Sequence, residues 1–286
     1  MNNNIALTAS AALLSGLFMI SGCSSDDGGG GGTAAVPANA TVIDDTNAEQ
    51  IIGAMASSLS SLDQALAVEA TPAMGLDAAI DHIKPLIKNR LKNSGIDLAT
   101  GASFNEVEEC LYGGTITASG DETDDYPNYS ETVTATFTNC SMFDGMVING
   151  TVSGTFTENQ DTSAYTDSVT GSLSITITAE PDTIKTSFNG LNFQESGNYY
   201  EGTFTTTKST FALSIEVNGT TQFAFLSELK ANIVESNGTS CPESGHILVT
   251  GGNGTTAEGI YNGDGMTMTI KANGDTVNDS YDCRYL

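Results

Sequence analysis

The chain has 286 residues, and its 35 acidic against 9 basic residues give a net charge of −26. Such an acidic chain is repelled by nucleic acid and by anionic lipid headgroups, so we expect no nucleic-acid partner. Tryptophan is absent, so the apolar core must come from Ile, Leu, Val, Phe and Met.

Residues 1–22 are predicted to be an export signal. The apolar run from Ile5 to Ile20 is too short to span a membrane comfortably. It ends in Ile20-Ser21-Gly22-Cys23, which resembles the lipobox of bacterial lipoproteins. The resemblance implies that Cys23 is lipidated, becomes the mature N-terminus and anchors the protein to a membrane.

Residues 23–44 are rich in Gly, Ser, Ala, Thr and Asp and are predicted to form a flexible tether. Ser24 follows the lipidated cysteine, where the inner-membrane retention signal of many Gram-negative lipoproteins is Asp, so we expect an outer-membrane location. Ser24-Ser25-Asp26-Asp27 before five glycines also resembles the acidic tether of some surface-exported lipoproteins. A plain spacer explains it equally well, so periplasmic and surface-facing orientations both stay open.

Residues 45–95 are predicted to form a helical pair. Thr46-Asn47-Ala48-Glu49 matches a capping box. It opens a helix over 46–70 whose apolar stripe is Ile52, Met55, Leu59, Leu62 and Leu66. A second helix over 76–94 has the stripe Leu76, Ile80, Ile83, Ile87 and Leu91, with a kink expected at Pro85 and a C-terminal cap at Gly95.

Four of the nine basic residues lie in this second helix, namely Lys84, Lys88, Arg90 and Lys92. One interpretation is a contact patch for an acidic partner or for lipid phosphates. The alternative is a solvated face, because Lys and Arg side chains are favoured near a helix C-terminus. His82 lies beside them, far in sequence from His246, the one other histidine.

Residues 96–286 are predicted to form an antiparallel β domain, because apolar and polar residues alternate over many short segments. Asn-Gly pairs, which favour tight hairpin turns, are expected between strands at 149, 189, 218, 253, 262 and 273. The expected strands are 110–119, 131–139, 145–157, 168–178, 183–194, 198–207, 209–217, 220–234, 244–250, 255–262, 265–272 and 276–284.

The predicted fold class is mainly β, an antiparallel meander of about 12 strands preceded by the helical pair. One apolar face per strand must be hidden, so the sheet closes into a barrel, stays open as a half-barrel, or forms a curved sheet. In each arrangement the helices pack with the sheet as one unit.

Four cysteines remain once Cys23 is assigned to the lipid. If 114–118 and 132–138 form a hairpin around Asp125, positions whose numbers sum to 250 face each other, as Cys110 and Cys140 do. Cys241 with Cys283 then follows by elimination. Four paired cysteines suit an exported protein.

No catalytic motif stands out, so the chain is predicted not to be an enzyme. It has no Gly-x-Ser-x-Gly elbow, His-Glu-x-x-His pair or phosphate loop. The weak metal candidates are Asp121, Glu122, Asp124 and Asp125, whose oxygens suit Ca²⁺. The same residue types are also good turn formers, and no other cofactor is expected.

Two functions remain open at this stage. The first is a non-enzymatic structural or surface-interaction protein of the cell envelope. The alternative is a carrier for a lipid-like hydrophobic ligand, held in a half-barrel lidded by the N-terminal helices. A carrier requires an apolar cavity, whereas a structural protein is packed solid.

The lipid anchor is directly testable. Cys23→Ser is expected to abolish acylation and release the protein from membranes, because the acyl chains supply the attachment. Palmitate labelling and membrane fractionation check this, with Ser25→Ala as a control that should stay labelled and membrane-bound. Unchanged labelling of the Cys23→Ser protein would show that the lipobox interpretation is wrong.

Overall fold

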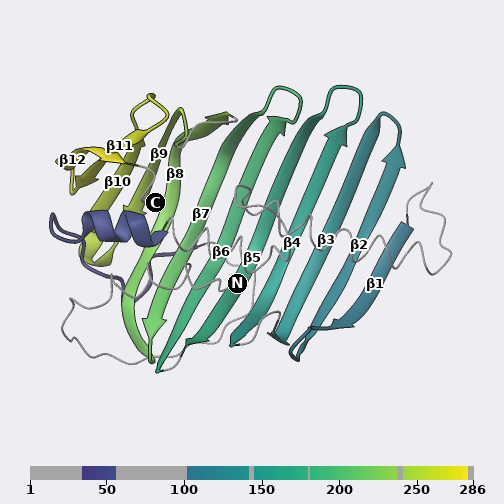
Figure 1. Cartoon of the computed structure of the whole chain (residues 1–286), viewed down its shortest axis with the longest axis horizontal. Helices are drawn as coiled ribbons and strands as arrows, with labels where there is room; N and C mark the ends of the chain where they lie inside the picture. Colours follow the sequence, from purple (N-terminus) through teal and green to yellow (C-terminus); the bar gives the residue numbers. More distant parts are fainter. Residues whose placement is uncertain (1–33, 56–101, 142–144, 180, 237–240, 283–286) are drawn as a thin grey trace, which may run out of the picture.

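The computed structural model describes residues 34–55, 102–141, 145–179, 181–236 and 241–282 (Figure 1). Its twelve strands form one antiparallel sheet in which chain order is also spatial order, which confirms the mainly β meander. The strands are β1 Ala102–Glu109, β2 Thr115–Asp125, β3 Asn128–Cys140, β4 Met146–Asn159, β5 Ala164–Ala179, β6 Asp182–Asn198, β7 Thr203–Val217, β8 Thr220–Ser236, β9 Ser244–Thr250, β10 Thr256–Tyr261, β11 Thr267–Ala272 and β12 Asp275–Asp282.

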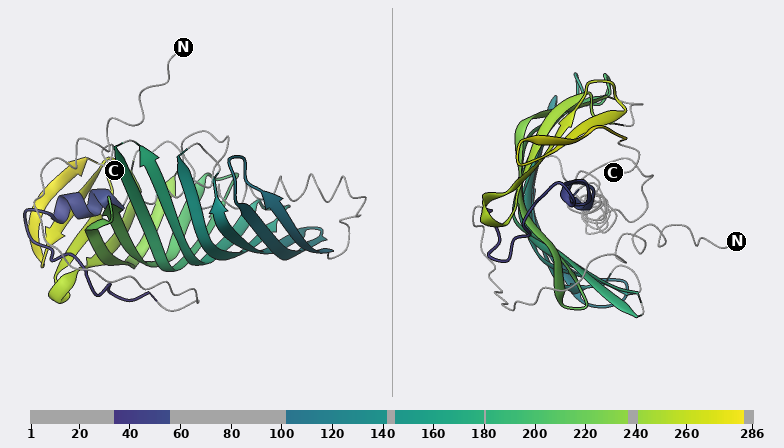
Figure 2. Two further views of the ribbon diagram at one scale, coloured as in Figure 1. Left: turned by 90° about the horizontal axis from the view of Figure 1, so that it is seen from below. Right: turned by 90° about the vertical axis from the view of Figure 1, so that its left-hand side faces the viewer.

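The sheet is open. Within the described residues each strand pairs with its neighbours in sequence, and β1 does not pair with β12, so the sheet does not close into a barrel. Figure 2 shows that it curves like a half-pipe, with a helix lying on the concave side. This leaves the half-barrel or curved sheet among the three predicted arrangements.

The predicted strand count is correct only because two errors cancel. The strand β1 was missed, since 110–119 was expected to come first. The predicted strands 198–207 and 209–217 are parts of one strand, β7, whose register with β8 shifts between Thr206 and Thr210. A bulge of this kind breaks the alternation that marks a continuous strand in the sequence.

The Asn-Gly pairs divide into turns and strand interiors. Asn218-Gly219 and Asn273-Gly274 connect strands as predicted, with φ of 52° and 76° in the first pair and 50° and 94° in the second. The pairs at 253 and 262 also lie in connections. The pairs at 149 and 189 do not, because they lie inside β4 and β6.

Gly150 is required by close strand packing rather than by a turn. Its φ is 127°, and a Cβ there would lie 2.2 Å from the carbonyl oxygen of Ser172 in β5. Gly171 of β5 has the reciprocal arrangement, 2.2 Å from the carbonyl oxygen of Thr151. The two glycines therefore let β4 and β5 approach where side chains would separate them.

The apolar core lies on the concave face of the sheet. Alternate residues of each strand point there, and the largest of them are completely or almost completely buried. They include Phe137, Ile148, Leu173, Phe188, Leu213, Phe225, Val249 and Ile270.

Residues 40–43 dock against the sheet, although they were predicted to belong to the flexible tether. Thr41 donates its backbone N–H to the carbonyl of Ala224 in β8 at 2.8 Å and accepts from the N–H of Gly252 at 2.8 Å. Ile43 follows and is 1% exposed. The apolar Val42-Ile43 pair is the sequence signal that marks the end of the tether.

A helix over residues 48–55 then lies against the concave face near β8–β12 (Figures 1 and 2). Ile52 and Met55 are buried as the predicted stripe requires, and Ile51, which is not in that stripe, is buried as well. The predicted capping box is not formed, because Asp44 accepts the N–H of Thr46 at 2.8 Å and Glu49 accepts from Asn278 at 3.0 Å. The rest of the helix predicted over 46–70, and the whole of that over 76–94, lie outside the described residues.

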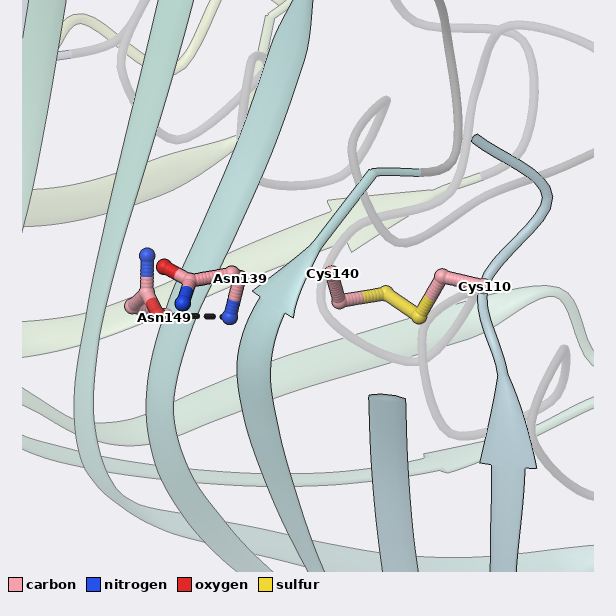
Figure 3. The surroundings of a disulfide bond; sticks show 4 residues. All are labelled: Cys110, Asn139, Cys140 and Asn149. Carbon is pink, nitrogen blue, oxygen red and sulfur yellow. Dashed lines mark hydrogen bonds between the residues drawn. A yellow bond between two sulfur atoms is a disulfide. The ribbon is translucent and has the colours of Figure 1, made fainter. Parts of the chain in front are cut away.

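Cys110 and Cys140 form a disulfide with Cα atoms 5.4 Å apart (Figure 3). The pairing matches the prediction, but the β2–β3 register from which it was predicted is wrong. Thr115 faces Thr138, and the hairpin turns at Tyr126-Pro127 rather than around Asp125. The bond instead joins the β1–β2 connection to the end of β3. Cys241 is also disulfide-bonded. Its partner lies outside the described residues, so the pairing with Cys283 stays a prediction.

The disulfide is expected to stabilise the β1 end of the sheet. It closes a loop with a sequence separation of 30. Chain entropy therefore predicts that the variant with both Cys110→Ala and Cys140→Ala loses about 3–4 kcal/mol of unfolding free energy, measured by urea denaturation. The double variant is preferable to a reducing agent, which would also break the bond of Cys241.

Asn149→Ala is the matched control for this measurement. It removes the hydrogen bond that the Asn149 side chain accepts from the backbone N–H of Asn139, at 2.7 Å and close to the disulfide (Figure 3). Its cost should be about 1 kcal/mol. A double cysteine variant no less stable than Asn149→Ala would contradict the prediction.

Candidate functional site

The predicted metal candidates do not converge. Asp121, Glu122, Asp124 and Asp125 lie in the strand β2 rather than in a turn. Their side chains therefore alternate between the two faces, with Glu122 buried on the concave face and Asp121 exposed on the convex face. Among the described residues, no group of three or more His, Cys, Asp or Glu side chains is arranged to hold a metal ion.

His246 forms a hydrogen bond with a glutamate side chain on the neighbouring strand. Its Nε2 lies 3.0 Å from Oε2 of Glu258 on the neighbouring strand β10. Both side chains are partly exposed. His82 lies outside the described residues, so the two histidines cannot be compared in space.

The convex face of β2–β5 carries an ordered array of hydroxyl groups, which we call the hydroxyl face. It consists of outward-pointing side chains in cross-strand rows. Its members are Thr117, Ser119, Thr132, Thr134, Thr136, Thr151, Ser153, Thr155, Ser168, Thr170 and Ser172. Because strands lie about 4.8 Å apart, these hydroxyls recur at a regular spacing across the sheet.

Neighbouring hydroxyls in the rows hydrogen-bond to each other. The Oγ atoms of Thr134 and Ser153 lie 2.9 Å apart, and the Thr136 and Thr151 hydroxyls lie 3.0 Å apart. Each hydroxyl has one donor proton and two acceptor lone pairs, so a single bond leaves capacity for a further partner. The rows are therefore both internally ordered and able to bind an outside ligand.

A hollow of about 730 Å³ opens over this array. Most of its lining residues carry hydroxyl, amide or carboxylate groups, and they come from β1–β5, with Ser103 and Asp121 at one side. Ser103 donates its hydroxyl to Oδ1 of Asp121 at 2.5 Å. The hollow can therefore accept a ligand rich in hydroxyl groups, and Asp121 adds one strong acceptor.

The opposite, concave face changes from apolar to acidic near the β2–β3, β4–β5 and β6–β7 turns. Glu122, Glu131, Asp167 and Glu195 lie there on successive strands, with Phe156 of β4 in the same row between Glu131 and Asp167. We call these four acids the carboxylate row. The Glu122, Glu131 and Asp167 side chains are all buried.

Aromatic rings line the carboxylate row. Phe156 lies 6.1 Å from both Tyr129 and Tyr165 between ring centroids, and Tyr165 stacks on Tyr199 at 4.5 Å. Tyr129 donates its hydroxyl to Oε2 of Glu131 at 3.1 Å, and Tyr165 donates to Glu195. Rings beside carboxylates form an environment that suits cationic groups.

The pKa of Tyr129 is raised well above its ordinary value. Burial of the phenol is the main cause, and the negative charges of Glu131 and Glu122 add to it. Tyr129 therefore stays protonated over the physiological pH range and remains a hydrogen-bond donor to Glu131.

Sequence reasoning missed the carboxylate row because the predicted strands were too short. Glu131 begins the predicted strand 131–139, whereas Asp167 and Glu195 lie one residue outside 168–178 and 183–194. In the structure these strands continue through both positions. Alternation with Val133, Val169 and Phe193, two residues away, is the signal that places the acids on the apolar face.

No protein-family model, curated protein or solved structure matches this chain. No helix of the described residues is long and apolar enough to cross a membrane. The function must therefore be argued from the two faces of the sheet.

Proposed function

We propose that this protein is a non-enzymatic surface-interaction protein of the bacterial cell envelope, attached through a lipid at Cys23, whose hydroxyl face binds neutral polysaccharide. The observation that carries the proposal is the hollow over β1–β5, with its lining of hydroxyl and amide groups and Asp121. A polyhydroxylated polymer offers donors and acceptors that match such a lining.

Charge favours a neutral polymer. With a net charge of −26, the chain repels phosphorylated or otherwise anionic glycans. The extended array also suits a polymer better than a small molecule, because repeating hydroxyl groups can bind several strands at once and individually weak contacts then add up.

The hydroxyl face is built for binding rather than for catalysis. Six of the hydroxyls in its rows pair with one another, as Thr155 does with Ser168, rather than with a base that would activate them. Together with the lipid anchor expected at Cys23, such a face would hold the cell envelope against a glycan layer.

Isosteric removal of hydroxyls tests this function. Thr134→Val and Thr155→Val are each expected to weaken binding to neutral polysaccharides such as dextran about fivefold, since a hydrogen bond contributes about 1 kcal/mol. Affinity electrophoresis measures the change. Thr176→Val, at a half-buried convex position of β5 outside the hollow, is the control.

Thermal melts of the three variants separate lost binding from lost stability. The proposal would be contradicted if Thr176→Val weakened polysaccharide binding as much as the other two substitutions do. It would also be contradicted if dextran and other neutral polysaccharides failed to retard the unmodified protein in affinity electrophoresis.

A second candidate function is a carrier for a lipid-like ligand. The observation that favours it is the open, curved sheet with a concave face lined by large apolar side chains such as Phe188, Leu213 and Phe225. A ligand could take the place of a second layer over part of this face.

Native mass spectrometry of protein extracted from its own membrane tests the carrier. Bound lipid should appear as a discrete mass increase that Leu213→Gln abolishes without unfolding the protein, while Thr134→Val leaves it unchanged. A ligand-free protein would exclude the carrier and leave the glycan-binding function untouched.

A further inference from the structure

The Asn-Gly pairs of this chain are candidate sites of spontaneous chemical modification. In such a pair the backbone nitrogen of the glycine can attack Cγ of the asparagine side chain, because glycine has no Cβ to shield that nitrogen. A bond from the nitrogen to Cγ forms, the bond from Cγ to the amide nitrogen breaks, and ammonia leaves with the proton of the glycine nitrogen. Water then opens the succinimide, at the side-chain carbonyl to give aspartate or at the main-chain carbonyl to give isoaspartate.

Two of the six pairs in the described residues are restrained by paired strands, β4 and β6. In β4, Oδ1 of Asn149 accepts the backbone N–H of Asn139 at 2.7 Å. In β6 the attacking nitrogen is itself engaged, since Gly190 donates its N–H to Oγ of Ser172 at 3.1 Å. Both pairs are therefore protected from the reaction. A seventh pair, at 237, lies outside the described residues.

The turn pairs at 218, 262 and 273 are held through both ends of the asparagine amide. In each, Oδ1 accepts a hydrogen bond and Nδ2 donates another, over distances of 2.8 to 3.1 Å. The partners are Thr183 and Asp182 for Asn218, Thr269 and Thr267 for Asn262, and Thr256 and Ile43 for Asn273. These bonds have to break before the side chain can turn toward the glycine nitrogen.

Asn253 differs from these five asparagines. It is an exposed residue in the short 3₁₀ helix Gly252–Gly254, between β9 and β10. Within the described residues its side-chain amide makes no hydrogen bond. A Cβ built on Gly254 would have no atom within 4 Å, so the surroundings of the attacking nitrogen are open. Neither a side-chain partner nor crowding at the glycine therefore opposes deamidation of Asn253.

The loop around Asn253 also holds residues 40–43, which we call the docked segment. Gly252 donates its backbone N–H to the carbonyl oxygen of Thr41 at 2.8 Å. Oγ1 of Thr255 accepts the backbone N–H of Ile43, also at 2.8 Å. The two loop residues that bind the docked segment thus lie on either side of the susceptible pair.

Isoaspartate at position 253 would disturb both contacts. Its main chain runs through Cβ, so one additional backbone carbon enters the loop between Gly252 and Thr255. The loop is tightly packed on its inner side, because a Cβ at Gly252 would lie 2.4 Å from the carbonyl oxygen of Ala40. A longer main chain therefore displaces the two groups that bind the docked segment.

We propose that Asn253 is the site at which the folded protein deamidates, and that isoaspartate there releases the docked segment from the sheet. The modification would be an irreversible, age-dependent change at the junction between the predicted tether and the sheet. It is independent of the proposed glycan binding, which uses the convex face of β1–β5.

Peptide mass spectrometry of the folded, full-length protein incubated in mildly alkaline buffer tests the site. Asn253 is expected to deamidate at least about fivefold faster than Asn218, Asn262 or Asn273, because a hydrogen bond of about 1 kcal/mol slows the attack by that factor. The control is the protein unfolded in urea, in which these asparagines should react at similar rates because glycine follows each. Equal rates in the folded protein, or no reaction at Asn253, would contradict the proposal.

Hydrogen exchange of the peptide containing residues 40–43 measures the release. Anion exchange isolates the deamidated protein, which has an additional negative charge, and electron-transfer fragmentation identifies isoaspartate in it. The peptide is expected to exchange at least about fivefold faster than in fresh protein, since loss of one hydrogen bond changes local opening by that factor.

Two variants are matched controls for the release. Asn253→Gly cannot deamidate and tolerates positive φ, so its exchange should not change with incubation. Freshly purified Asn253→Asp adds the charge without the additional backbone carbon and should exchange like fresh wild-type protein. Unchanged exchange in the isoaspartate protein, or an equal increase in fresh Asn253→Asp, would show that a longer main chain does not release the segment.

Discussion

The structure depends on the need of a single curved sheet to cover one apolar face. Strict alternation sends large side chains of β2–β11 to the concave side, where Phe188 and Leu213 are completely buried. One sheet layer cannot exclude water from its own face, so a second layer is a condition of folding rather than an addition. Ile43 and the helix over 48–55 supply it beside β8–β12.

The two faces divide the work of the molecule. Burial of apolar side chains on the concave face stabilises the fold, while the convex face presents a regular array of hydroxyl groups at the surface. Gly150 and Gly171 connect the two roles, because they bring β4 and β5 close together beneath the rows in which Thr134 pairs with Ser153. The close spacing of the rows is therefore a product of backbone packing as much as of the hydroxyl side chains.

Some features that sequence reasoning assigned to function have a structural explanation. Asp121, Glu122, Asp124 and Asp125 resemble a Ca²⁺-binding turn, but β2 extends through them and separates them between two faces. Conversely, Thr41 and Ile43 were predicted to belong to the flexible tether. Thr41 instead hydrogen-bonds to Ala224 of β8, just beyond Leu226, where the pairing of β8 with β9 stops. Short polar segments are ambiguous because the same residue types serve turns, edges and linkers.

The sequence by itself determined what depends on neighbouring residues: the period-2 alternation, the antiparallel meander, the turns at Asn218-Gly219 and Asn273-Gly274, and the apolar stripe of Ile52 and Met55. Tertiary structure alone decided what depends on distant contacts. Pairing with neighbouring strands sets the register of β2 with β3 and extends β5 and β6 through Asp167 and Glu195. It also makes β7 one continuous strand with a bulge, where the sequence indicated two strands. Curvature and openness belong to this second class, because they are set by twist and packing summed over twelve strands, and no short stretch of sequence encodes that sum.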